Sequence, residues 1–191
     1  MLEEGAGVGV VCSLNRLSEK AVASGFVNFS PDPDGMSRRA PLLIQYKGEI
    51  YPSLALSMVL QLSGADNLVL KTNGNALRSL HYQGTSVPVD PHGHLMIKFR
   101  GPKRSYDYVS AADIMDGNVS SERLQGRIVF VGTSATGLKE VLTTTFDPVF
   151  PGVEINAAVV DNLLTGDLIS LPGWSNRIIL LLVLVLGLSL S

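Results

Sequence analysis

The chain has 191 residues, of which 46% are hydrophobic and only 17% are charged, and its formal net charge is −2. This composition excludes a disordered protein, because the apolar content is high and the net charge is small. It gives no support for nucleic-acid binding, since there is no block of basic residues. The single cysteine, Cys12, excludes a disulfide scaffold and any multi-cysteine metal site.

Short apolar runs alternate with turn residues in the first part of the sequence. They predict a buried strand at residues 7–12, a short helix at 14–24 and a short strand at 26–29. A tight turn at 30–35 and the two strands of a hairpin, at 40–46 and 49–51, are predicted next. The hairpin is expected because Lys47-Gly48 lies between two runs of strand-forming residues.

The remainder of the chain continues this alternation. It predicts a helix at residues 54–62, opened by Pro52-Ser53, and four short strands at 68–71, 77–82, 86–89 and 94–99. A helix at 110–117, begun by a capping box at Ser110, a buried central strand at 127–132 and a long helix at 151–164 follow. The strands at 86–89 and 94–99 are expected to pair across the turn DPHG. The long helix is expected to bury its apolar positions Val153, Ala157, Val160 and Leu164 and to stop at Gly166.

Because strands and helices interleave, the predicted fold class is α/β or α+β, a mixed sheet with flanking helices, followed by a truncated transmembrane helix. The last element is expected from residues 178–191, of which eleven of fourteen are strongly apolar and none is charged. Fourteen residues are too few to span a bilayer, which needs about 20. A buried C-terminal helix is the alternative, but the run has no polar face. Trp174 and Arg177 precede it, as expected at a membrane interface.

One candidate ligand-binding group stands in the turn at residues 30–35 and just after it. Asp32 and Asp34 resemble the start of a calcium loop, but Met36 and Leu43 occupy positions where an EF-hand needs oxygen ligands, so no metal site is predicted. Arg38 and Arg39 are close enough to pair with these carboxylates in a structural turn. The alternative is that the arginine pair contacts an anion or another small ligand. Asp32, Asp34, Arg38 and Arg39 are therefore the candidate binding residues.

Other motifs do not carry recognisable chemistry. The glycine-rich segment 131–139 lacks the Lys-Ser/Thr ending of a phosphate loop, so a tight turn after a strand is expected there. His92 and His94, with Asp90, lack a third fixed ligand and are expected to be surface residues of a turn. No pair of titratable residues stands out as catalytic, and no cofactor is predicted.

Several segments, taken together, resemble the CHASE2 sensory domain family, and their order and spacing carry the resemblance. They are GFVNFSPDPDGMSRRAPLLI, YPSLALSMVLQLSG, VPVDPHGHLMIKFRGP, VSAADIMDG, GRIVFVGTSATGLKEVLTT and FPGVEINAAVVDNLLTGD, at residues 25–44, 51–64, 87–102, 109–117, 126–144 and 150–167. Compared with the family pattern, we expect the sequence to lack an N-terminal transmembrane helix and the first half of the sensor. It also has Glu140 and Thr144-Thr145 where an Asp and a Thr-Pro are common.

The resemblance implies an extracytoplasmic sensor in the bacterial cytoplasmic membrane, relaying a signal to an adenylate or guanylate cyclase or a kinase output domain that is not present here. Residues 1–173 would be the sensor and 174–191 the start of a transmembrane helix. The expected partners are the membrane, an unidentified small-molecule or environmental ligand, and a second copy in a homodimer. We expect poor solubility for a domain that lacks its first half.

Two other function classes stay open. The first is a membrane-anchored small-molecule-binding module that works without an effector. The second is a hydrolase using Asp34, His81 or Ser134, which would require these side chains to converge in one pocket. For the residues present here we expect no catalytic activity.

Overall fold

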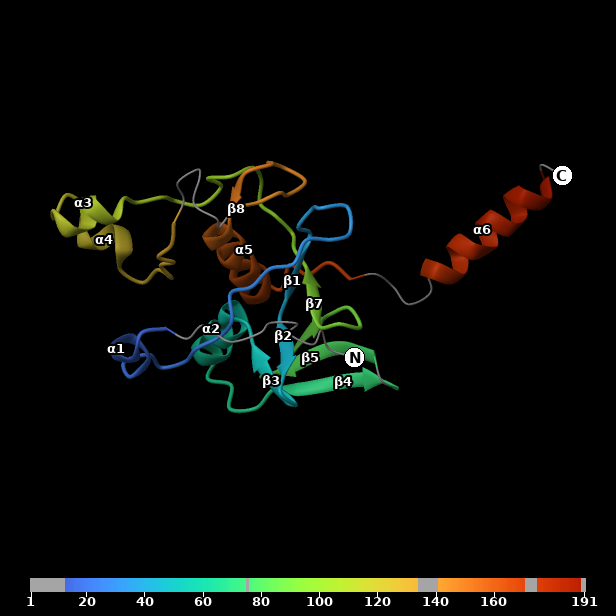
Figure 1. Ribbon diagram of the computed structural model, residues 1–191, viewed down its shortest axis with the longest axis horizontal. Helices are drawn as coiled ribbons and strands as arrows, with labels where there is room; N and C mark the ends of the chain where they lie inside the picture. Colours follow the sequence, from blue (N-terminus) through green and yellow to red (C-terminus); the bar gives the residue numbers. More distant parts are fainter. Residues whose placement is uncertain (1–12, 75, 134–140, 171–174, 190–191) are drawn as a thin grey trace.

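The computed structural model describes residues 13–74, 76–133, 141–170 and 175–189 (Figure 1). The helices are α1 (Asn15–Ser18), α2 (Leu54–Ser63), α3 (Ala111–Met115), α4 (Ser121–Leu124), α5 (Gly152–Thr165) and α6 (Ser175–Ser189). The strands are β1 (Arg39–Pro41), β2 (Leu43–Tyr46), β3 (Glu49–Pro52), β4 (Val69–Asn73), β5 (Ala76–Tyr82), β6 (Thr85–Pro88), β7 (His94–Met96), β8 (Val141–Leu142) and β9 (Phe150–Pro151).

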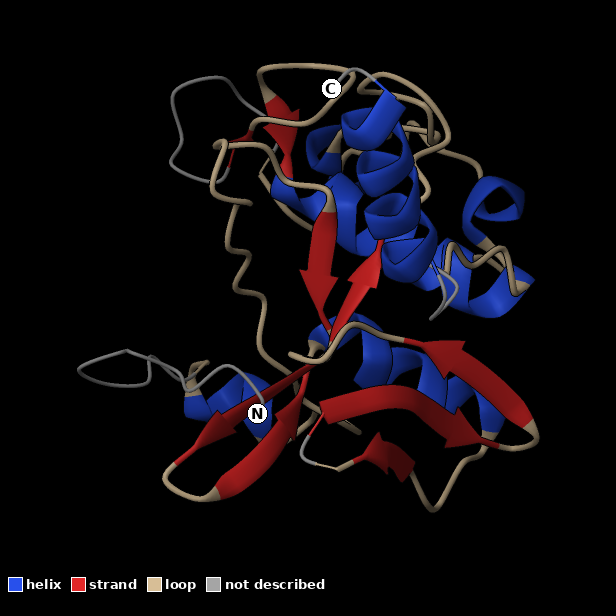
Figure 2. Ribbon diagram, turned by 90° about the vertical axis from the view of Figure 1, so that its right-hand side faces the viewer, coloured by secondary structure: helices blue, strands red, loops and turns tan. Residues whose placement is uncertain are grey.

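The strands form small antiparallel sheets, ordered β1–β7, β2–β3, β4–β5–β6 and β8–β9. These sheets lie at different angles to one another (Figure 2). The predicted mixture of helices and strands is therefore confirmed. One continuous mixed sheet is not found in the described residues, where the one parallel pairing is an isolated bridge between Phe26 and Ser53.

The chain from β1 to β2 connects two of these sheets. β1 pairs with β7, and β2 pairs with β3. Between them, Leu42 donates its N–H to the carbonyl of Gly93 at 3.0 Å, and its own carbonyl accepts the N–H of Ser53 at 2.9 Å. The apolar side chains along this extended segment are buried: Ala40, Leu42 and Leu43.

The predicted β2–β3 hairpin is confirmed. Lys47 and Gly48 both have positive φ, 51° and 85°. Two consecutive residues in this region form the tight turn whose twist matches that of the flanking strands. Glycine enters this conformation without a steric penalty, which explains why Lys47-Gly48 marks the turn.

Helices α2 and α5 pack against each other. The side-chain oxygen of Ser53 accepts the N–H of Leu56 at 3.2 Å and caps the start of α2. Gly64 and Gly166, both in the left-handed conformation, end α2 and α5. Both helices match their predicted ranges to within one residue. The largest fully buried apolar side chains of the core are Phe150, Leu42, Leu43, Leu56, Leu80, Leu95, Ile155, Val59, Val87 and Val159.

The buried face of α5 differs from the predicted apolar stripe. Of the four predicted positions only Val160 is buried, and Leu164 is 49% exposed. The side chains that α5 buries are Glu154, Ile155, Asn156, Ala158, Val159, Val160, Asn162 and Leu163. The reason is that α5 is covered on more than one side, because α2 packs on it and residues 98–108 hydrogen-bond to its polar side chains. A helix covered in this way does not follow a single stripe.

The predicted pairing of residues 86–89 with 94–99 is wrong. β6 pairs with β5, and β7 pairs with β1, more than fifty residues earlier in the chain. A turn does form at Asp90, whose N–H donates to the carbonyl of His94 at 2.9 Å. The chain diverges before this turn, because Val89 donates its N–H to the carbonyl of Arg78.

The predicted central strand at residues 127–132 is also wrong. This segment is irregular, and Ile128, Val129 and Val131 are 41%, 50% and 89% exposed. Within the described residues no strand lies beside it to accept its hydrogen bonds, and a β-branched composition alone does not form a strand. Gly132 is nevertheless in a close contact, since a Cβ there would lie 2.7 Å from the Cβ of Val153.

Smaller differences concern the short elements. The helix predicted at 14–24 is limited to α1, and the strand predicted at 26–29 is reduced to the bridge at Phe26. α3 begins after Ser110 as expected, but the Ser110 side chain makes no capping hydrogen bond. The strand predicted at residues 7–12 lies outside the described residues.

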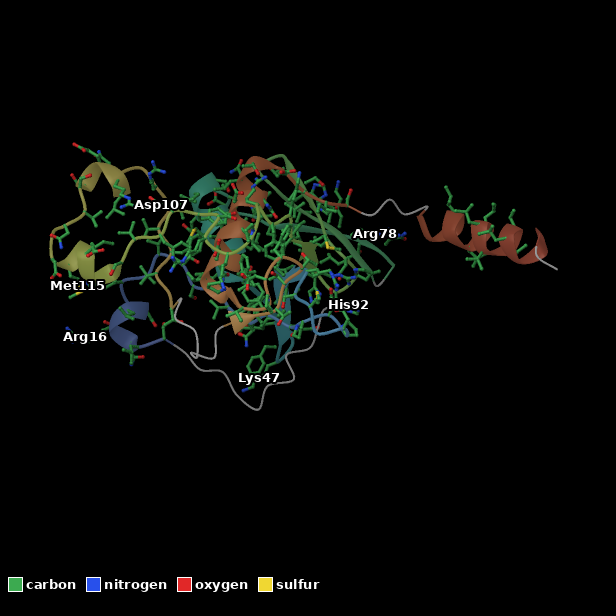
Figure 3. The ribbon with its side chains drawn as sticks, turned by 90° about the horizontal axis from the view of Figure 1, so that it is seen from above. Arg16, Lys47, Arg78, His92, Asp107 and Met115 are labelled. Atoms are coloured by element: carbon green, nitrogen blue, oxygen red, sulfur yellow. The ribbon has the colours of Figure 1, made fainter. Side chains whose placement is uncertain are left out.

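Helix α6 extends away from the rest of the molecule (Figures 1 and 3). Its described large side chains, such as Leu180 and Leu184, are between 47% and 68% exposed, so α6 is not packed as a buried helix against the described chain. No helix in the described part of the chain is both long enough and apolar enough to cross a membrane. The start of a transmembrane helix therefore stays a prediction.

Candidate functional site

The candidate residues lie in and just after a tight turn that leads into β1. Asp32 accepts the N–H of Gly35 with its carbonyl at 2.8 Å, and its own N–H donates to the carbonyl of Met36 at 2.8 Å. Gly35 has a φ of 81°, a conformation that an L-residue rarely adopts. Asp34 accepts the N–H of Met36 at 3.1 Å. The turn therefore holds both aspartates beside the start of the strand.

The guanidinium of Arg38 binds both aspartates. Its Nη1 and Nη2 contact Asp34 Oδ1 and Oδ2 at 3.0 and 2.7 Å, and Nη1 also contacts Asp32 Oδ2 at 3.2 Å. The two-point contact with Asp34 is the geometry in which arginine binds a carboxylate best. The hydrogen bonds from Arg38 lower the pKa of Asp34 below its usual range.

Arg39 extends the group to a second element. Its Nε lies 3.7 Å from Asp32 Oδ1, and its Nη1 lies 3.3 Å from Asp90 Oδ2. Asp90 in turn lies 3.6 Å from Nδ1 of His94, at the start of β7. The structure thus brings all four predicted residues together and adds Asp90 and His94. We call these six residues, Asp32, Asp34, Arg38, Arg39, Asp90 and His94, the turn cluster.

The sequence predicts Asp90 only as a residue of the turn DPHG, beside His92 and His94. The Asp90 carboxylate accepts the N–H groups of His92 and His94, each at 2.9 Å, so it also shapes its own turn. Its proximity to Arg39 follows from the β1–β7 pairing, which places Pro41 opposite His94. Because that pairing joins distant segments, local sequence patterns could not predict it.

The chemistry that the turn cluster offers is the exchange of one ion-pair partner for another. It holds three carboxylates and two guanidiniums, and each guanidinium already contacts carboxylates. An incoming anion would have to displace one of these carboxylates. The Nε of Arg39 is buried and has no hydrogen-bond acceptor, although Asp32 is nearby. Among the described residues no group of three or more His, Cys, Asp or Glu side chains could hold a metal ion.

The structure does not assemble the hydrolase alternative in its described part. The carboxylate of Asp34 is bound by Arg38, and Nε2 of His81 lies 2.8 Å from Ser79 Oγ and 3.4 Å from Ser86 Oγ. Ser134, with the rest of the glycine-rich segment 134–140, lies outside the described residues.

Sequence reasoning missed one buried carboxylate, Glu154 in the first turn of α5. It is 2% exposed, and it accepts the N–H groups of Arg104 and Ser105 at 3.0 Å and the hydroxyl of Tyr108 at 2.6 Å. Burial raises the pKa of Tyr108 most, and the hydrogen bond to this carboxylate raises it further. These contacts hold the loop 100–108 on α5, so Glu154 has a structural function.

A neighbouring phenol is held in a similar way. The hydroxyl of Tyr106 donates to Asp161 Oδ2 at 3.3 Å. Burial, together with the negative charge of Asp161, raises the pKa of Tyr106 to about 12. The side chains of Arg100, Tyr106 and Tyr108 therefore contact carboxylates of α5, whereas Lys103 pairs with Asp147.

Comparison with known proteins gives one family. The family model described as CHASE2 domain matches residues 6–190, which is nearly the whole chain. No curated protein and no solved structure matches it.

Proposed function

The chain belongs to the CHASE2 family, and on that premise we propose that it is the extracytoplasmic sensory domain of a bacterial membrane-bound signal-transduction protein. The family consists of sensory, non-catalytic domains of signal-transduction proteins. A match over residues 6–190 is the observation that carries the proposal. The output is an adenylate or guanylate cyclase or a kinase elsewhere in the parent protein.

In this proposal α6 connects the sensor with the membrane. The support is its composition, because residues 178–191 contain no charged side chain, and its exposure, since its described leucines and valines are not covered by the rest of the chain. A helix that is apolar on all sides requires an apolar environment. The bilayer supplies one, so α6 would form part of a longer spanning segment.

The ligand would act at the turn cluster. Support for this part comes from the four predicted residues Asp32, Asp34, Arg38 and Arg39, which share one surface at the β1–β7 ladder. A ligand that competes for the guanidiniums would change the contacts of β1. A sensor of this kind requires a ligand that binds one of two conformations more tightly than the other.

The membrane part is tested by flotation of the full chain with phospholipid vesicles in a density gradient. We expect the chain to float with the vesicles and a variant with Leu181→Lys and Leu184→Lys to remain at the bottom. A matched control, Leu14→Lys with Leu17→Lys, changes two exposed leucines of the α1 region and should still float. If the unsubstituted chain stays at the bottom, the membrane assignment is wrong.

The side of the membrane is tested by labelling. Met115 is 86% exposed, so Met115→Cys in a Cys12→Ser background leaves one thiol within these 191 residues, at an accessible position. With the protein expressed in its natural reading frame, an impermeant maleimide should label this thiol in intact spheroplasts. Labelling only after lysis would place the domain in the cytoplasm and contradict the proposal.

A further inference from the structure

Four charged side chains join the segment that follows β7 to the end of α5. Nζ of Lys98 lies 2.5 Å from Asp167 Oδ1, and Nη1 of Arg100 lies 2.7 Å from Asp167 Oδ2. Nε of Arg100 also contacts Asp161 Oδ2 at 2.5 Å. Two cations thus face two carboxylates and their charges cancel. We call Lys98, Arg100, Asp161 and Asp167 the exit cluster.

Backbone contacts strengthen the same junction. The side-chain amide of Asn162, which is fully buried, accepts the N–H of Lys98 at 2.8 Å and donates to its carbonyl at 3.0 Å. Beyond the helix, Ile169 forms an antiparallel bridge with Met96 of β7. The segment 96–100 is therefore fixed both to α5 and to the chain that leaves it.

Asp167 connects this junction with the segment that leads toward α6. Asp167 follows Gly166, the residue that ends α5, and it begins the segment leading toward α6. In Figure 1 this segment passes beside β7 before the chain reaches α6. The ion pairs to Lys98 and Arg100 lower the pKa of Asp167, so its carboxylate stays charged at neutral pH.

The exit cluster shares one short segment of chain with the turn cluster. Asp90 and His94 belong to the turn cluster, and Lys98 and Arg100, only a few residues later, belong to the exit cluster. β7, which begins at His94, connects the two clusters and is held to β1 over three residue pairs. A shift of β7 along or away from β1 would move both clusters together.

We propose that the exit cluster is the joint that passes a change at the turn cluster to the segment entering α6. The inference rests on the proposed function, since it gives α6 the role of the output element. Its ion pairs suit a reversible joint, because all four side chains are 28–47% exposed and pairs of that kind are individually weak. Coupling of this type requires a two-state element that both sites bias. Here that element is β7.

The test is hydrogen–deuterium exchange of the detergent-solubilised full chain, followed in peptides covering residues 94–100, 167–170 and β5. Asp167→Asn removes the charge that Lys98 and Arg100 bind and keeps the side-chain size. We expect amides of 167–170 to exchange about three to ten times faster, while β5 is unchanged. Lys98→Gln, which breaks only one pair, should give a smaller change in the same peptide.

The decisive variant is Asp90→Asn, which does not touch the exit cluster. The Oδ1 that accepts two backbone N–H groups is kept, and the charge facing Arg39 and His94 is lost. We expect about twofold or faster exchange in 167–170, and reciprocally Asp167→Asn should accelerate exchange near His94, because coupling between two sites acts in both directions. The double variant should differ from the sum of the single effects.

The matched control is Asp107→Asn. Asp107 is paired with Arg123 at 2.6 Å, far from β7 in the described structure, and it lies at the opposite end from α6 (Figure 3). It should leave both peptides unchanged. Unaltered exchange of 167–170 in Asp90→Asn would overturn the proposal. So would faster exchange of β5 in both exit-cluster variants, since the cluster would then serve overall stability.

Vesicle flotation keeps this result separate from the proposed function. If exchange is coupled but α6 does not bind vesicles, the joint exists and the membrane role is wrong. If α6 binds vesicles and exchange is uncoupled, the membrane role holds and the joint is wrong.

Discussion

At the scale of single residues, buried polar side chains place the loops that apolar packing leaves undetermined. Glu154 holds loop 100–108 through two backbone N–H groups and one phenol, and Asn162 holds Lys98 through both of its backbone groups. A buried acceptor or donor that loses its partner destabilises the folded state by its full desolvation cost. These two side chains should therefore be sensitive to conservative changes.

Glu154→Gln tests this directly. The amide would place its N–H₂ group against either one or two of the three donors, and these would lose their acceptor. We expect the free energy of unfolding to fall by about 2–3 kcal/mol, measured by urea denaturation. Glu122→Gln, at an exposed glutamate of α4, should change it by less than about 0.5 kcal/mol. Equal effects of the two variants would contradict a special role for Glu154.

At the scale of elements, two helices with a serine at the N-cap are expected to respond differently to the same substitution. Ser53 is buried and its oxygen accepts the N–H of Leu56, whereas Ser110 makes no capping hydrogen bond. Ser53→Ala should cost about 1 kcal/mol of unfolding free energy, and Ser110→Ala a few tenths at most. Thermal denaturation of both variants checks this. A larger loss for Ser110→Ala would mean that α3 is capped in solution.

The same contrast separates what the sequence could predict from what it could not. α2, α5 and the hairpin at Lys47-Gly48 depend on caps, glycines and turns within one segment, so local patterns predict them. The pairing of β7 with β1 and the irregular segment 127–132 depend on which partners lie nearby in space. Strand-forming composition carries no information about those partners.

The residues of the turn cluster fall into the same two groups, those predictable from local spacing and those brought in by strand pairing. Asp32, Asp34, Arg38 and Arg39 lie within eight residues, so their association could be predicted from spacing. Asp90 and His94 join them only through the β1–β7 ladder. The exit cluster was not predicted at all, because it combines residues near positions 100 and 165 that α5 brings together.

At the scale of the whole molecule, paired aspartates make stability depend on acid pH. Hydrogen bonds from arginine or lysine lower the pKa values of Asp34, Asp107 and Asp167 in the folded state. Because the unfolded chain then binds protons more readily, stability is full above pH of about 4 and falls as pH decreases through the folded pKa values. Urea midpoints measured from neutral to acid pH should show this loss.

The control for the acid dependence is a variant that lacks two of these carboxylates, Asp34→Asn with Asp107→Asn. Its urea midpoint should be lower than that of the parent at neutral pH and should change less between pH 6 and pH 3. Identical pH slopes for parent and variant would show that the acid loss arises from other groups.

The distribution of apolar surface predicts self-association. Leu17, Met115 and Val131 are 63%, 86% and 89% exposed, and α1 and α3 lie at the end of the molecule opposite α6 (Figures 1 and 3). Exposed apolar groups at both ends favour aggregation in water. In detergent-free buffer we therefore expect sedimentation velocity to show oligomers of the full chain. A monomeric parent chain would contradict this.

The two ends can be tested separately. Leu181→Lys with Leu184→Lys should reduce association through α6, and adding Met115→Lys with Val131→Lys should reduce it further, because lysine removes apolar surface and adds repulsive charge. If charge alone were responsible, Asn118→Lys with Thr145→Lys, at two exposed polar positions, would have the same effect as the changes at Met115 and Val131. We expect this control to leave the remaining association in place, because it removes no apolar side chain. Association through Met115 and Val131 then depends on their apolar surface, independently of α6 and of the membrane.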